Sequence, residues 1–269
     1  MKHTYIISAL LTLAIYLSAC EDKKMKQDAA EVTQHAKDSG EQSISATEEQ
    51  IIYWVTEIDE EAEKSVDIAY SLQLSNEREE VQAYIYHVNG IPTRIEEKYS
   101  DYIHKTYGTR YYYLQNDELI LSKEIKDEVL SDSTYQMRET VTFYSDSKPT
   151  KSTTRTAAYE EELLLMSFTE IPLQPHPFNE VIEIINNTGD YRLSFSDIIE
   201  TEHSTFIIFA TKSAKKYTTA LMVEYRDDFA NQLLSNKKKY KGKLVEVDFE
   251  LVTDNGMTFQ AYRGGKFID

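Results

Sequence analysis

The sequence predicts a mainly β protein of the α+β class, in which an antiparallel meander with a leading helix is followed by a second β-rich domain. Three observations predict this class. Apolar and polar residues alternate along many short segments, which is the period of a half-buried strand. Several of these segments are joined by short turns rich in Asn, Asp and Gly, as in β-hairpins. Helical spacing of apolar residues is confined mainly to residues 48–62 and 227–236.

The leading helix is predicted over residues 48–62. Thr47 stands three residues before Gln50, which is the spacing of a capping box. The apolar residues that follow at helical intervals are Ile51, Ile52, Trp54, Val55 and Ile58. A helix therefore precedes the first predicted strand.

The antiparallel meander is predicted between residues 66 and 155. A first strand is expected to place alternate apolar residues on one face: Val66, Ile68, Tyr70, Leu72 and Leu74. Three hairpins are expected at residues 81–99, 110–123 and 137–155, the first of them with an Asn89-Gly90 turn. Residues 157–168 fit a short helix or a last strand equally well.

A domain boundary is predicted around Pro172, Pro175 and Pro177, because proline interrupts regular structure. Charge changes there as well. Residues 181–269 hold 12 basic and 13 acidic residues, a net charge of −1, whereas the whole chain has 29 and 46, a net charge of −17. The first 180 residues therefore carry −16. The predicted domains are 47–171, an antiparallel β-rich domain, and 178–269.

The second domain is predicted to be an OB-like five-stranded barrel. Strand patterns cover residues 191–199, 205–211 and 218–225, a helical pattern covers 227–236, and strand patterns cover 243–252 and 257–267. This is the order of elements in the OB barrel. The stretch Lys239-Tyr240-Lys241-Gly242-Lys243-Leu244-Val245-Glu246-Val247 also resembles a segment of small bacterial envelope proteins with OB-like folds.

The N-terminus has the pattern of a secretion signal. Basic Lys2 and His3 precede an apolar run at residues 5–16, which is too short to span a bilayer. The run ends in Leu17-Ser18-Ala19-Cys20, which resembles the lipobox of bacterial lipoprotein precursors. An ordinary signal peptide with a chance cysteine is the alternative.

The lipobox resemblance implies cleavage after a signal peptide at residues 1–19 and attachment of a diacylglycerol to Cys20. Acylation of the new amino group is implied as well. Residues 20–46 are then a lipidated flexible tether, because they are polar and lack an apolar period. The expected location is the bacterial cell membrane or outer membrane, with an exported, lipid-anchored chain. Cys20 is the one cysteine, so no intrachain disulfide can form.

Known catalytic patterns are missing from the sequence. The six histidines are dispersed, and the glycine-rich phosphate-binding and serine-hydrolase motifs do not occur. We therefore predict no metal site, no cofactor and no catalytic residue. The acidic balance argues against nucleic acid as a partner. The cluster of lysines at residues 237–243 is read as a complement to the helix C-terminus.

Tyrosine is the unusual residue of this chain, with 20 copies. Tyr111 and Tyr113 share one face of a predicted strand, and Tyr86, Tyr113 and Tyr144 each precede a turn. Tyrosine suits binding surfaces because it combines a large apolar face with a hydrogen-bonding tip. Packing within the sheet is the alternative. The candidate binding residues are Tyr111, Tyr113, Tyr86 and Tyr144.

These observations together predict a membrane-anchored cell-envelope lipoprotein with a non-enzymatic binding or assembly role. Its expected partners are membrane lipid, through Cys20, and an envelope protein or glycan. Two alternatives remain. Clustered acids such as Glu160-Glu161-Glu162 allow a hydrolase that acts on envelope polysaccharide through paired carboxylates. The acidic surface also suits an immunity or inhibitor protein with a basic target.

Overall fold

The structure is a computed structural model that describes residues 46–130 and 134–268. The predicted signal peptide, Cys20 and nearly all of the predicted tether lie outside the described residues. The segment Ile44–Asp269 forms one compact unit, and the predicted division of this region into two domains stays a prediction. Within the described ranges, no helix combines the length and apolar content needed to cross a membrane.

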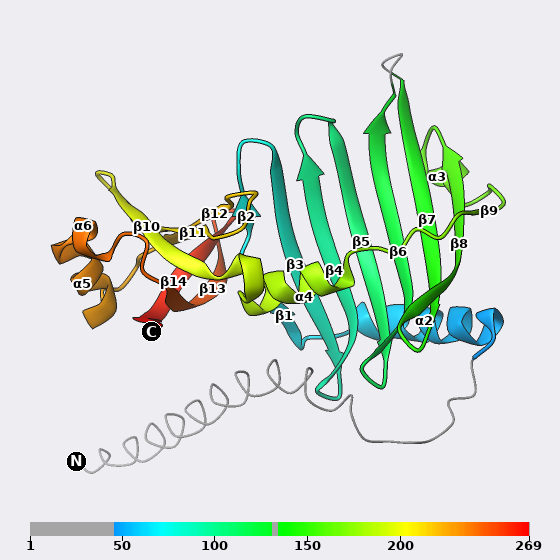
Figure 1. The fold of residues 1–269 in the computed structure, drawn as a ribbon, viewed down its shortest axis with the longest axis horizontal. Helices are drawn as coiled ribbons and strands as arrows, with labels where there is room; N and C mark the ends of the chain where they lie inside the picture. The colour runs from blue at the N-terminus through cyan, green and yellow to red at the C-terminus, as the bar shows by residue number, and fades with distance from the viewer. Residues whose placement is uncertain (1–45, 131–133, 269) are drawn as a thin grey trace, which may run out of the picture. The chain divides into compact units, whose positions relative to one another are not determined.

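The protein is mainly β, as predicted, and its strands form one large mixed sheet (Figure 1). The strands of the first half are β1 (Ile68–Tyr70), β2 (Leu74–Ser75), β3 (Glu79–Val88), β4 (Ile91–Asp101), β5 (Thr106–Gln115), β6 (Glu118–Val129), β7 (Tyr135–Ser145), β8 (Lys148–Ala157) and β9 (Thr169–Ile171). Strands β3 to β9 pair antiparallel with their sequence neighbours. The predicted meander is therefore confirmed.

The turns of the meander follow the predicted chemistry. Asn89 and Gly90 both have positive φ, which matches the right-handed twist of the strands that they join. Asn116-Asp117 and Asp146-Ser147 also have positive φ at the tips of the next two hairpins. Each of these hairpins contains a β-bulge close to its turn.

The predicted first strand over residues 66–74 is broken into β1 and β2. Ser71 lies at the break, where its N–H donates to the Ala83 carbonyl at 2.8 Å and its hydroxyl accepts from the Ala83 N–H at 2.9 Å. The hydroxyl thus replaces a backbone acceptor and interrupts the ladder. Val66 lies outside the sheet and is 99 % exposed.

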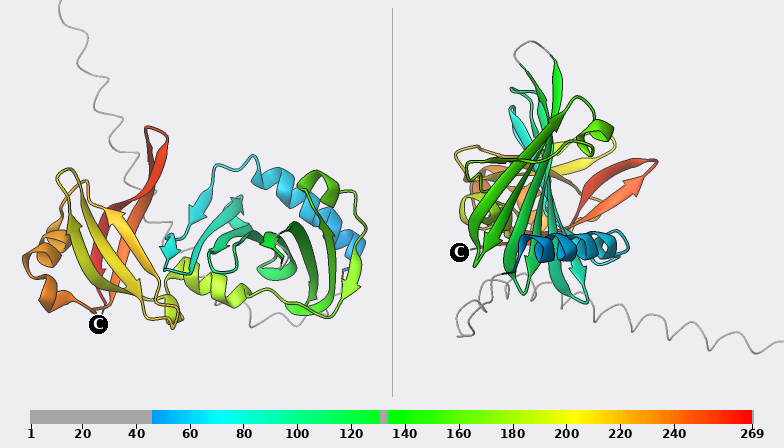
Figure 2. Two further views of the ribbon diagram at one scale, coloured as in Figure 1. Left: turned by 90° about the horizontal axis from the view of Figure 1, so that it is seen from above. Right: turned by 90° about the vertical axis from the view of Figure 1, so that its right-hand side faces the viewer.

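Helices cover both faces of the meander (Figure 2). The leading helix α2 (Glu48–Ala62) has the predicted capping box between Thr47 and Gln50. It packs on one face, here called the α2 face, over an apolar core that includes Ile51, Tyr113 and Phe143. A helix that the sequence pattern did not predict, α4 (Phe178–Asn186), packs on the opposite face, called the α4 face.

The core under α4 contains Tyr112, Leu114 and Val181. Residues 157–168, for which helix and strand both remained open, form the short helix α3 (Glu160–Leu163) and the loop after it. The loop at residues 172–177 then leads across the α4 face into α4 (Figure 1). The path of this loop therefore determines which polar residues of the α4 face are covered.

The second half has the predicted order of elements: β10 (Leu193–Glu200), β11 (Thr205–Thr211), β12 (Thr218–Met222), α5 (Asp228–Ser235), α6 (Lys237–Tyr240), β13 (Val245–Asp254) and β14 (Met257–Phe267). A short 3-10 helix precedes them at Gly189–Tyr191. The main path of the sheet runs from β10 to β9 and is open. The predicted closed five-stranded barrel is therefore not confirmed, since β12 also continues into the first half through β2.

Candidate functional site

The four predicted tyrosines are divided between the two faces of the sheet. Tyr86, Tyr111 and Tyr113 lie on the α2 face, where the rings of Tyr111 and Tyr113 stack at 6.5 Å and the Arg94 guanidinium lies 4.1 Å from the Tyr86 ring centre. Tyr144 belongs to the core of the α4 face. The structure therefore brings three of them together and separates the fourth.

These tyrosines are more enclosed than a binding surface requires. Tyr113 is fully buried and Tyr144 is 5 % exposed. Tyr111 and Tyr86 are half-buried. Neighbouring residues of a strand point to opposite faces, so both can belong to a core only where both faces are covered. Because helices cover both faces, Tyr112 and Tyr113 are both buried.

The Tyr113 hydroxyl donates to both oxygens of Asp59 at 3.0 Å. Arg94 donates to the same carboxylate at 2.8 Å. Burial, together with Asp59, raises the pKa of Tyr113. These bonds attach α2 to β4 and β5, so they have a structural role that needs no ligand.

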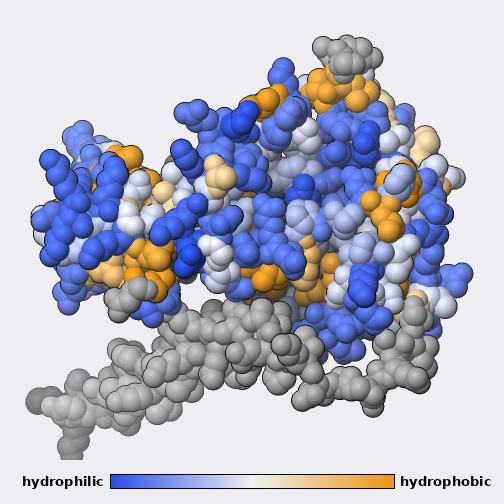
Figure 3. Space-filling model, viewed as in Figure 1, coloured by the Kyte–Doolittle hydropathy of each residue, from blue (hydrophilic) through white to orange (hydrophobic). Residues whose placement is uncertain are grey.

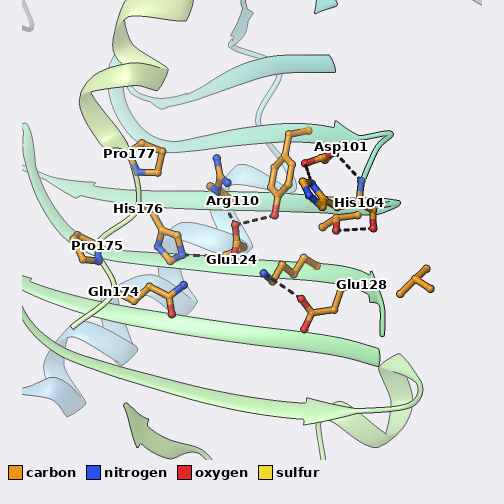
Figure 4. A pocket seen from close by; sticks show the side chains of 13 residues that line it. Asp101, His104, Arg110, Glu124, Glu128, Gln174, Pro175, His176 and Pro177 are labelled. Carbon is orange, nitrogen blue, oxygen red and sulfur yellow. Dashed lines mark hydrogen bonds and ion pairs between the residues drawn. The ribbon is translucent and has the colours of Figure 1, made fainter. Parts of the chain in front are cut away.

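A polar hollow of about 590 Å³ lies on the α4 face, beside the loop at residues 172–177 (Figure 4). The α4 side faces the viewer in Figure 1, and the space-filling view in the same direction shows a largely hydrophilic surface over β5 and β6 (Figure 3). The residues that line the hollow are Tyr99, Asp101, His104, Thr106, Arg110, Glu124, Lys126, Glu128, Val129, Gln174, Pro175, His176 and Pro177.

Arg110 is the centre of a buried charge network on the wall of this hollow. In the sheet it lies directly between Glu97 of β4 and Glu124 of β6. Arg110 Nε donates to Glu124 Oε1 at 2.8 Å, and its Nη1 lies 3.3 Å from both oxygens of Glu97. The Tyr99 hydroxyl donates to Glu124 Oε1 at 2.8 Å and the Tyr112 hydroxyl to Glu97 Oε2 at 2.9 Å.

The two carboxylates have opposite pKa shifts. Burial raises the pKa of Glu97, although Arg110 and the Tyr112 hydroxyl favour its ionised form. Burial also acts on Glu124, but Arg110 and the Tyr99 hydroxyl outweigh it and hold the pKa of Glu124 below its usual range. Glu124 is therefore an ionised acceptor at neutral pH.

His176 is held over the network by hydrogen bonds to two strands. Its Nδ1 lies 2.7 Å from Ser122 Oγ of β6, and its backbone N–H donates to the Tyr144 hydroxyl of β7 at 3.3 Å. The side chain of His176 is 4 % exposed. Burial lowers its pKa to about 4, against the opposing effect of Glu124. The imidazole is thus neutral at pH 7.

The other charges of the hollow are paired within it. His104 Nδ1 lies 2.6 Å from Asp101 Oδ2, and Lys126 Nζ lies 3.4 Å from Glu128 Oε2. Figure 4 shows these pairs along the edge of the hollow that lies away from α4. The walls therefore hold acids and bases in nearly balanced number.

The position of Tyr99 depends on the residue opposite it in β5. Tyr99 pairs with Gly108, and a Cβ built on Gly108 would lie 2.5 Å from Cζ of the Tyr99 ring. The Arg110 guanidinium lies 4.2 Å from the centre of the same ring. The ring is thus held between the glycine backbone and the guanidinium.

Sequence reasoning missed this site. Arg110 and Glu124 lie in one predicted hairpin, but the register that pairs them depends on a β-bulge between Tyr113 and Leu114 that the sequence pattern does not show. His176 lies 54 residues from Ser122, and nothing near it in the sequence indicates their contact. In the described part of the chain, no group of three or more His, Cys, Asp or Glu is arranged to hold a metal ion.

Comparisons with protein-family models, with curated proteins and with solved structures found no match for this chain.

Proposed function

We propose that this chain is a membrane-anchored lipoprotein of the bacterial cell envelope with a non-enzymatic binding role, and that the hollow on the α4 face is its binding site. The Leu17-Ser18-Ala19-Cys20 sequence supports the export and the anchor. The anchor is tested by growing cells with labelled palmitate. Label that is incorporated into the wild type and lost in Cys20→Ala is expected, and equal labelling of both would contradict the anchor.

One observation carries the choice of the hollow as the binding site. His176 Nε2 is buried and has no hydrogen-bond partner among the described residues. It faces Glu124 Oε2, which is 4.0 Å away and beyond hydrogen-bond distance. Buried polar atoms are nearly always hydrogen-bonded, so an unsatisfied one on the wall of a hollow indicates a place for another molecule.

The volume and composition of the hollow also support a binding role. Ligand pockets usually enclose roughly 300 to 1,000 Å³, and the hollow falls within this range. Its side chains are held in place by the hydrogen bonds of Arg110, Glu124 and Ser122, so few groups need to be ordered when a ligand binds.

The test is a titration of the full chain, in detergent micelles, with fractions extracted from the envelope of the producing cells. The imidazole ¹⁵N signals of His176 report on the site. We expect one fraction to shift them and the shift to disappear in Thr106→Trp, which fills the hollow without removing a network residue. The matched control is Thr201→Trp, on the exposed turn between β10 and β11. Absence of any shift, or binding that Thr106→Trp leaves unchanged, would contradict the proposal.

A hydrolase that acts on envelope polysaccharide is the second candidate. The observation that favours it is the pair Glu97 and Glu124, whose pKa values are displaced in opposite directions. The test is incubation of the protein with purified cell-wall glycan. New reducing ends formed by the wild type and lost in Glu97→Gln would favour the hydrolase over the binding protein.

We also infer that β10 to β14 follow the OB-like order. Three observations support it: β12 and β14 pair in parallel at Met222 and Ala261, helices α5 and α6 lie between β12 and β13, and an antiparallel bridge joins Ser194 to Leu244. At this bridge the Phe195 N–H donates to the Lys243 carbonyl at 2.9 Å, and beside it the Gly242 N–H donates to the Phe195 carbonyl at 2.7 Å. Hydrogen exchange at these two amides that is as slow as in β11 is expected, and fast exchange would contradict the inference.

A further inference from the structure

The hydrogen bonds around His176 indicate which ring nitrogen carries the proton. The His176 N–H donates to the Tyr144 hydroxyl, which lies 3.1 Å from Ser122 Oγ. Every proton in this series of hydrogen bonds has an acceptor when the Tyr144 hydroxyl donates to Ser122 Oγ and the Ser122 hydroxyl donates to His176 Nδ1. Nδ1 is then the acceptor of a neutral ring, so Nε2 carries the proton and is a donor.

The group opposite this donor is an acceptor. Arg110 Nε and the Tyr99 hydroxyl both donate to Oε1 of Glu124. Its Oε2 faces His176 Nε2 at 4.0 Å. At this separation an atom within hydrogen-bond distance of both must lie beside the line that joins them, where it would accept from Nε2–H and donate to the carboxylate. A hydroxyl group does both, whereas a carboxylate, a phosphate oxygen or an ammonium does only one.

The remaining charges argue against a charged ligand. Arg110 is neutralised by Glu97 and Glu124, and Lys126 lies 3.4 Å from Glu128. An anion would have to displace one of these carboxylates. A cation would approach Arg110 and Lys126 while leaving the Nε2–H donor without an acceptor.

We propose that the hollow binds a neutral carbohydrate, one hydroxyl of which accepts from His176 Nε2–H and donates to Glu124 Oε2. This inference rests on the proposed function, because it names the ligand class of the same site. The volume of about 590 Å³ is enough for a short oligosaccharide. The polar walls suit a molecule that offers a hydroxyl on almost every carbon.

The experiment uses the full chain in detergent micelles and three defined probes: cellotriose and tri-N-acetylchitotriose as neutral sugars, and trigalacturonate as an anionic one. The envelope extract is added before and after periodate oxidation, which cleaves vicinal diols. The readouts are the His176 ¹⁵Nε2 shift and calorimetric affinity. We expect a neutral probe or the untreated extract to shift the signal, and periodate to remove the effect of the extract where the bound sugar carries a vicinal diol.

Two variants connect the signal to the hydrogen bonds. His176→Phe removes the donor and is expected to weaken calorimetric binding by about two- to tenfold, the scale of one hydrogen bond between neutral groups. His203→Phe, an exposed histidine outside the hollow, is expected to have no effect. Thr106→Trp should weaken binding as much as His176→Phe. It leaves the hydrogen bonds among His176, Ser122 and Tyr144 intact, so weaker binding in this variant is not explained by misfolding after their loss.

The outcomes separate this inference from the proposed function. Binding of trigalacturonate without either neutral sugar, or identification of the active extract component as a molecule without sugar, would contradict a neutral carbohydrate as the ligand and leave the proposed binding site in place. No shift of His176 with any probe or extract would overturn both, and a water molecule would then account for the space between His176 and Glu124.

Discussion

The α2 face and the α4 face of the meander are made by the same strands but are closed to different extents. On the α2 face, a helix of 15 residues covers an apolar core that includes Tyr113 and Phe143. On the α4 face, a helix of 9 residues covers the core near Tyr112, and the surface near Arg110 remains a hollow. The length and position of the covering helix therefore decide which face is available to a ligand.

Both faces also bury an ion-pair network. On the α2 face it joins Arg94 to Asp59 and Glu96, and beside the hollow it joins Arg110 to Glu97 and Glu124. A buried ion pair is often no more stabilising than well-packed apolar residues, although it is costly to break. Stability alone thus gives no reason for either network.

The largest effect that distinguishes the two faces is expected from Arg110→Met. The change leaves Glu97 and Glu124 buried without their cation, so it should lower the free energy of unfolding by about 3 to 5 kcal/mol. Urea unfolding followed by the fluorescence of Trp54, which packs on the α2 face, measures this. The control is Arg263→Met, which breaks exposed pairs and should change stability by less than about 1 kcal/mol. Equal effects of the two variants would show that the Arg110 network is no more costly to break than exposed ion pairs.

The second-largest effect on stability is expected from a substitution that creates a cavity in the core of the α2 face. Leu121 is 3 % exposed in the core beneath α2, and Leu121→Ala should lower the free energy of unfolding by roughly 3 kcal/mol. The same urea experiment applies. Leu173→Ala is the matched control, because Leu173 is 54 % exposed and should have little effect. If Leu121→Ala is tolerated as well as the control, α2 does not seal that face.

The α4 face should respond to pH through His176. Because the folded pKa of His176 is about 4 and that of an unfolded histidine about 6.5, the unfolded chain binds this proton first. The free energy of unfolding therefore falls as the pH is lowered from 6.5 to 4, by about 2 to 4 kcal/mol from this group. Urea denaturation at pH 7 and pH 4 measures the free energy of unfolding of the wild type and of His176→Gln. The variant should lack the part of the loss in stability that comes from protonation of His176.

His203→Gln is the control for this titration, because the side chain of His203 is 86 % exposed. It should follow the wild type at both pH values. A loss of stability that is the same in the wild type and His176→Gln would show that the titration of His176 is not coupled to folding.

The smallest effect sharpens the account of the α2 face. Tyr113→Phe removes the hydroxyl that donates to Asp59, while Arg94 still pairs with Asp59, so a loss of about 1 kcal/mol is expected. Tyr53→Phe removes an exposed hydroxyl that bonds to Glu57 of the same helix. No measurable change is expected from it in thermal or urea unfolding. A larger loss from Tyr53→Phe would mean that the tyrosine bonds of α2 act within the helix and not between helix and sheet.

Local patterns in the sequence predicted much of this fold. The spacing of Thr47 and Gln50 fixed the start of α2, and Asn89-Gly90 fixed the first hairpin, because each signal lies within one element. Helix α4 was missed, although Phe178, Val181 and Ile185 stand at helical spacing between Pro177 and Asn187. Asn187 has a positive φ of 50°, which is typical of a residue that ends a helix.

The candidate site was less accessible to sequence reasoning, for physical reasons. The choice of tyrosines depended on an exposed face, and exposure is decided by helices packed from elsewhere in the chain. Ser122, Tyr144 and His176 lie on separate elements and meet only after the loop at residues 172–177 crosses the sheet. Their contact has no periodicity or spacing that the sequence displays.

The close packing of Gly108 under the Tyr99 ring has a consequence for the evolution of this chain. A mutation that adds a side chain at position 108 must move the ring, and the ring carries one of the hydroxyls that hold Glu124 in place. The two positions are therefore expected to change together. Among relatives of this chain, loss of Gly108 should be accompanied by loss of Tyr99, and with it by loss of one hydroxyl that holds Glu124.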